Sequence, residues 1–248
     1  MRILDPRDRP PRRRMPVAVA AALVIAFLCS AAQAGTIVQF GQTNPADMIT
    51  ATASAGVTSF STAGNADGGG VSVPVTITNL FGTPGLSIPA FETFVGVSTT
   101  GPAFSVFGVA VQEVNGTIEI TSGIGGAGIN YVTATFTDAT LPARVGGLVG
   151  GDQLQLGAAG PPDTLLLTSS LGILGPPTSM TLGFSNVEPP VAISGTTLAG
   201  FTGQNAGTFA ANVIPEPASV ALLGIGMSVL IALRRFFKPS SAPDRNEN

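Results

Sequence analysis

The 248-residue sequence contains no histidine, no tryptophan and a single cysteine, Cys29. Without histidine, nucleophilic catalysis by a Ser-His-Asp or Cys-His set is excluded. One cysteine cannot form a disulfide framework. The residues after Cys29 contain neither cysteine nor histidine, so they also lack the ligands of a structural zinc site.

Positive charge is almost absent from the middle of the chain. Between Gly35 and Pro217, Arg144 is the only cation and there are ten carboxylates, a net charge of −9. One arginine cannot build a phosphate-binding patch, which argues against nucleic acid as a partner. The same stretch has no lysine, so Ser-Lys catalysis is excluded as well.

The remaining candidates for chemistry are carboxylates. Glu113 and Glu119 are expected on opposite faces of one hairpin, where they cannot flank a glycosidic bond. The sequence therefore predicts no enzyme and no cofactor. Calcium is the one metal that the ligand set allows, and Asp67 in a glycine-rich loop is its candidate, with Asp47 or Asp152 as outside ligands. The same loop is also a simple turn between strands, and this interpretation is favoured.

The N-terminus has the three regions of a secretory signal peptide, predicted over residues 1–34. Six arginines precede an apolar run over 17–29, and Ala32 and Ala34 supply the small side chains of a cleavage site. Thirteen residues span about 20 Å as a helix, which is short for a bilayer core of about 30 Å. Cleavage would leave Gly35 as the first residue and would remove Cys29.

The C-terminal part has a second tripartite pattern. Pro215, Glu216 and Pro217 are followed by an apolar run over 218–233 that is typical of a transmembrane helix, and then by basic residues over 234–238. Arg234, Arg235 and Lys238 are expected to stop transfer and to leave the polar tail, 239–248, in the cytoplasm. The two ends of the chain therefore agree in placing the intervening residues outside the cytoplasm.

The body, residues 35–211, has the pattern of an all-β domain. Short runs rich in Val, Ile, Thr and Phe alternate with Gly, Pro, Asn and Asp clusters, and their number and spacing predict a single β-sandwich or jelly-roll-like ectodomain. Asn115-Gly116 predicts a two-residue type I′ hairpin turn. That hairpin would place Val111 and Ile118 on the core face and Gln112 on the other.

The C-terminal pattern resembles the PEP-CTERM sorting signal of exported bacterial proteins. The resemblance covers residues 214–237, within a predicted sorting segment 212–238, and includes the Pro-Glu-Pro motif, the apolar run and the arginine pair in order. It implies that Pro215, Glu216 and Pro217 are recognised by an exosortase-type processing enzyme in the membrane. It also implies a cell-envelope, extracellular-matrix or biofilm location, with extracellular polysaccharide as a further partner.

Two functions are therefore expected for the body. One is a structural or adhesive role on the cell surface after export, inner-membrane anchoring and processing. The alternative is a ligand-binding module, for sugar or calcium, on the same anchor. Both keep the membrane and the processing enzyme as partners, and neither assigns ligand-binding residues in the body beyond Asp67.

Overall fold

The computed structural model describes residues 34–46, 48–146, 154–158 and 163–214. Within these ranges the chain is all-β and contains no α-helix, as the alternation of β-branched runs and turn residues predicts. The described strands all belong to one compact unit, Gln33–Asn248. Eleven of them form one antiparallel sheet, and β11 and β12 form a separate two-stranded pair.

The strands differ greatly in length, and two short 3₁₀ turns lie between strands, η1 after β3 and η2 after β6. The elements are β1 (Gly35–Gln42), β2 (Ile49–Ser54), β3 (Val57–Ser61), η1 (Ala66–Gly68), β4 (Val73–Leu80), β5 (Thr83–Val106), β6 (Val109–Thr121), η2 (Ile124–Gly126), β7 (Asn130–Arg144), β8 (Leu154–Ala158), β9 (Thr164–Thr168), β10 (Ile173–Glu188), β11 (Ile193–Ser194), β12 (Thr197–Leu198) and β13 (Phe201–Ile214).

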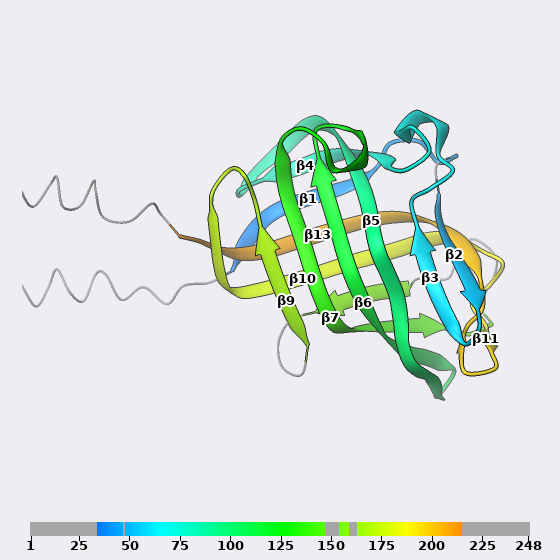
Figure 1. Cartoon of the computed structure of the whole chain (residues 1–248). Helices are drawn as coiled ribbons and strands as arrows, with labels where there is room; N and C mark the ends of the chain where they lie inside the picture. The colour runs from blue at the N-terminus through cyan, green and yellow to red at the C-terminus, as the bar shows by residue number, and fades with distance from the viewer. Residues whose placement is uncertain (1–33, 47, 147–153, 159–162, 215–248) are drawn as a thin grey trace, which may run out of the picture. The chain divides into compact units, whose positions relative to one another are not determined.

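The large sheet closes on itself. From β1 the hydrogen-bonded partners run through β4, β5, β6, β7, β8, β10 and β13, and β13 pairs again with β1. The hairpin of β2 and β3 connects β13 to β5, because β2 pairs with β13 and β3 pairs with β5. Strand β9 pairs with β7 on the edge opposite β6. In Figure 1, β5, β6, β7 and β9 run steeply across the view while β1, β10 and β13 cross behind them. Two layers thus face each other.

The space between the layers holds the hydrophobic core. Phe60, Phe184 and Phe201 form a cluster with ring centroids 6.0–6.3 Å apart, in tilted and edge-on contacts. Phe40 and Phe209, from the paired strands β1 and β13, stack at 5.9 Å. Most of the phenylalanines that the structure describes therefore fill the interior rather than line a binding surface.

The predicted hairpin turn at Asn115-Gly116 is wrong. Both residues lie inside β6, which runs unbroken past them and pairs with β5 and β7. Gly116 has φ +155°, and a Cβ there would lie 2.6 Å from the Val97 Cα. The glycine is thus required because a neighbouring strand approaches closely at a bulge, and not because the chain reverses.

The same correction changes which residues face the core. In the predicted hairpin, odd-numbered residues before the turn and even-numbered residues after it would face the core. In a continuous strand, the residues that face the core have the same parity throughout. Ala110, Gln112, Val114, Ile118 and Ile120 are all buried, while Val111 is only half-buried. Gln112 therefore faces inward, opposite to the prediction. Its amide bonds the carbonyl of Gly101 and the backbone N–H of Leu198.

The observed two-residue turns lie elsewhere and use a common pattern. Ala55-Gly56, Phe81-Gly82 and Phe107-Gly108 each join consecutive strands, and both residues of each pair have positive φ. This is the type I′ geometry, in which glycine is favoured at the second position. Phe107, at φ +50°, is fully exposed at the tip between β5 and β6.

Candidate functional site

Most residues of the predicted sorting and processing sites lie outside the described residues. This holds for Ala32, Pro215, Glu216, Pro217, Arg234, Arg235 and Lys238. No helix long and apolar enough to cross a membrane is found among the residues that the structure describes. The two predicted apolar segments, 17–29 and 218–233, fall outside those residues and stay predictions.

The points where the described chain begins and ends lie together. Ala34 and Gly35, the predicted cleavage residues, are exposed, and Gly35 is the first residue of β1. Gly35 pairs with Ala211 of β13, three residues before the last described residue, Ile214. Both predicted membrane-directed segments are therefore attached to the same end of the sheet, which Figure 1 shows at its left.

Asp67 lies in the short turn η1 and is exposed. Its carboxylate accepts a long hydrogen bond of 3.4 Å from the Asn44 side chain. No group of three or more carboxylate, histidine or cysteine side chains is found within the described ranges. The proposed outside ligands, Asp47 and Asp152, are not among the described residues. The calcium candidate therefore has one carboxylate among the described residues and stays a prediction.

Glu113 and Glu119 both lie on β6, and both side chains point to its outer face, contrary to the prediction of opposite faces. Six residues of extended strand separate them by about 20 Å. The two carboxylates of a glycosidase lie roughly 5–10 Å apart, so this pair is too widely spaced to flank one bond.

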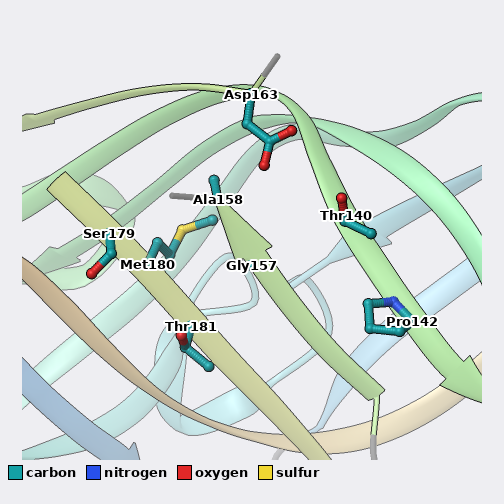
Figure 2. Close-up of a pocket in the computed structure, with 8 residues that line it drawn as sticks. All are labelled: Thr140, Pro142, Gly157, Ala158, Asp163, Ser179, Met180 and Thr181. Carbon is teal, nitrogen blue, oxygen red and sulfur yellow. The ribbon is translucent and has the colours of Figure 1, made fainter. Parts of the chain in front are cut away.

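A surface hollow of about 340 Å³ lies over the short strand β8, between β7 and β10. Figure 2 shows Thr140 and Pro142 on one side, Ser179, Met180 and Thr181 on the other, and Gly157 and Ala158 on the floor, with Asp163 above. Gly157 pairs with both Thr140 and Thr181. Because it has no side chain, the floor stays open between two rows of larger residues.

The described lining of this hollow offers hydrogen-bonding groups. Three hydroxyls, from Thr140, Ser179 and Thr181, and the carboxylate of Asp163 are its side-chain polar groups. Among these described lining residues there is no histidine or lysine, and no hydrogen bond joins the Ser179 hydroxyl to the Asp163 carboxylate, so the lining does not contain the hydrogen-bonded pair of an activated nucleophile and its base. The lining suits a small, neutral, hydroxyl-rich molecule better than an anion, because its one charge is negative.

The most unusual polar group is in the core. Glu92 of β5 and Asn205 of β13 are both buried, and the Asn205 Nδ2 donates to Glu92 Oε1 at 2.7 Å. On β4 and β6 the cross-strand neighbours of Glu92 are Val73 and Ile120, both fully buried. Burial disfavours the charged form and raises the pKa of Glu92 from 4.5 to about 8.

A protonated Glu92 would give a hydrogen-bond partner to the two atoms of this pair that otherwise have none. Glu92 Oε2 and Asn205 Oδ1 have no hydrogen-bond partner among the described residues. A neutral carboxylic acid carries one O–H donor, and the amide oxygen of Asn205 is an acceptor. A protonated Glu92 that donates to Asn205 would therefore complete a two-bond ring between the layers. Sequence reasoning missed this pair, although Ala90, Glu92 and Phe94 share one parity along β5 and all three are buried.

Comparison with protein-family models, with curated proteins and with solved structures found no match for this chain.

Proposed function

We propose that this chain is an exported, membrane-anchored bacterial surface or extracellular-matrix protein, sorted and processed through Pro215-Glu216-Pro217. The observation that carries the proposal is the order of parts: a leader, a closed β domain, the proline motif, an apolar run and a basic cluster. The pairing of Gly35 with Ala211 supports it, because both membrane-directed segments then leave one end of the domain.

In this proposal the body is a non-enzymatic, β-sandwich-like ectodomain with a structural or adhesive role. Its surface supports such a role: the described carboxylates other than Glu92 are exposed or half-exposed, and threonine pairs such as Thr117 with Thr135 line the outer face of β6 and β7. A negatively charged, hydroxyl-rich surface remains soluble in the medium and binds neutral polymer through hydrogen bonds.

The test is the fate of the C-terminus in the native host. Replacing Pro215-Glu216-Pro217 by three alanines should leave the protein in the inner membrane with its tail attached. The matched control replaces Pro239-Ser240-Ser241 by alanines, which removes a proline from the tail but leaves the motif intact. Mass spectrometry of the mature C-terminus distinguishes the two. An unchanged mature C-terminus in the motif variant would show that the segment is a plain single-pass anchor.

The hollow over β8 favours a second candidate, a small-ligand module on the same anchor. Its volume of about 340 Å³ falls within the usual range for small-molecule sites. A ligand of the native state raises the melting temperature by mass action. Neutral monosaccharides and calcium are the two probes, and Asp163→Asn is the matched variant. A shift with either probe that Asp163→Asn abolishes would support this candidate, and no shift at millimolar concentrations would leave the structural role.

A further inference from the structure

The end of the sheet from which the chain continues toward residue 218 carries four exposed aliphatic side chains. Leu171, Ile173, Val213 and Ile214 are 46, 54, 42 and 42% exposed, and they are named here the anchor-end rim. Ile173 pairs with Ile214 across β10 and β13, so these two side chains share one face of the sheet, and Val213, next to Ile214 in β13, extends the rim to the other face. Isolated apolar side chains are common on surfaces, but a contiguous group marks a contact surface.

The described chain segments that form this end of the sheet are uncharged. No Asp, Glu, Lys or Arg occurs in the chain segments that form this end, 35–38, 80–82, 169–175 and 210–214. Phe81, in the β4–β5 turn, adds a partly buried ring beside the connection that carries Leu171. These described segments therefore bring no carboxylate to an anionic membrane surface, although the body as a whole is strongly acidic, and Glu216, two residues after Ile214, lies outside the described residues.

The distance to the predicted anchor sets what this end meets. Only residues 215–217 separate Ile214 from the apolar run that begins at Ala218. A chain spans at most about 3.5 Å per residue, so Ala218 lies within about 14 Å of Ile214. If 218–233 crosses the bilayer, the rim is held at the headgroup region, where apolar side chains of bound proteins reach about 5–10 Å deep.

We infer that the anchor-end rim is a membrane-contact surface, which seats the domain on the lipid bilayer with the β1 and β13 ends toward the lipid. This rests on the proposed function, because the anchor supplies the proximity. A second copy of the chain is a poorer occupant: a standard protein interface buries about 800 Å² per partner, far more than four half-exposed side chains provide.

Single-cysteine labelling tests the inference in the full chain. In a Cys29→Ser background, an environment-sensitive fluorophore is attached at Ile173→Cys or Val213→Cys, with Val57→Cys and Phe107→Cys as controls. Val57 is 41% exposed, similar to the rim, and both control residues lie at the β2–β3 and β5–β6 hairpins, at the right of Figure 1, away from the rim. The chain is reconstituted into phosphatidylcholine–phosphatidylglycerol vesicles and recovered by flotation.

The expected result is a blue-shifted emission at 173 and 213, quenching by a lipid-attached nitroxide, and a several-fold lower quenching by aqueous iodide than at 57 and 107. Equal iodide quenching at all four sites on floated vesicles would overturn the inference and leave the anchor standing. Lipid quenching at 57 or 107 in place of 173 would also overturn it. A chain that does not float with the vesicles refutes the anchor first, and the rim inference with it.

Discussion

Replacing Glu92 by glutamine should stabilise the protein at neutral and higher pH and remove most of the stability loss that occurs between pH 4.5 and 8. Glutamine keeps the shape of a protonated glutamic acid, and its amide can accept from Asn205 Nδ2 and donate to Asn205 Oδ1. The wild-type side chain is fully buried and already accepts that first hydrogen bond. The substitution therefore removes only the ability to ionise.

The pKa gives the size and the sign of the effect. Glu92 has a pKa of about 8 in the folded state against 4.5 as the reference value. Below pH 4.5 both states are protonated and ionisation contributes nothing. Between pH 4.5 and 8 the unfolded chain has released a proton that the folded chain keeps, so the stability of the wild type falls as pH rises. Above pH 8 the loss levels off.

One pKa unit corresponds to 1.36 kcal/mol, so the full loss is about 5 kcal/mol, of which about 3 kcal/mol is reached at pH 7. For a domain of this size, about 3 kcal/mol corresponds to a melting temperature roughly 6–12 °C higher in the variant at pH 7. At pH 4 the two proteins should melt within a few degrees of one another.

The assay is urea unfolding of the detergent-solubilised full chain at pH 4, 5.5, 7 and 9. Glu113→Gln is the matched control, because Glu113 is exposed on β6 and its replacement should change stability by no more than about 0.5 kcal/mol. If Glu92→Gln and the wild type show parallel pH profiles between 5 and 9, Glu92 is not a buried neutral acid, and the account of the pair is wrong.

Three further predictions follow from the fold. Gly116→Ala should lower stability by about 2 kcal/mol or more, because the added Cβ would overlap the Val97 backbone. The control Gly41→Ala should be near neutral, because its Cβ would meet only the Ala206 Cβ, at 3.8 Å. Equal denaturation midpoints for the two variants would show that the strands do not approach closely at Gly116. Phe107→Asn should leave the free energy of unfolding unchanged or raise it by up to about 1 kcal/mol, because asparagine tolerates the positive φ of this fully exposed turn residue. A clear loss of stability would show that the Phe107 side chain makes a stabilising contact. N-terminal sequencing of exported protein should begin at Gly35, at the start of β1, and a start inside β1 would count against the predicted cleavage site.

The all-β character could be predicted from the sequence, because runs such as Val73–Leu80 and Asn130–Arg144 are rich in β-branched residues. The length of β5 could not. It contains Pro84, Pro89, Gly96, Gly101 and Pro102, which are usual signs of strand ends. The structure accommodates Gly96 and Gly101 in register shifts against β6, where both adopt positive φ.

The interior could be predicted only in part. The alternation of apolar residues identifies Ile118 and Ile120 as core residues, and both are fully buried. Glu92 and Gln112 escape that reasoning because polarity argues for an exposed side chain, whereas their partners, Asn205 and Leu198, are supplied by strands about ninety or more residues further along the chain. The hollow over β8 likewise depends on which strands flank Gly157, and no local pattern gives that information.

The pairing of β1 with β13 has a consequence for the order of events in the proposed export. β13 pairs with β1, β10 and β2, so these three pairings can form only after β13, the last described strand in the sequence, is available. Such pairings between the ends of a chain give a high contact order and slow folding. If the chain is exported as proposed, the ring cannot close until residue 211, the partner of Gly35, has crossed the membrane, only a few residues before the apolar run. Any proteolytic cut before Ile214 would remove residues from this closing strand, so the proposed processing at Pro215-Glu216-Pro217 would leave the strand whole.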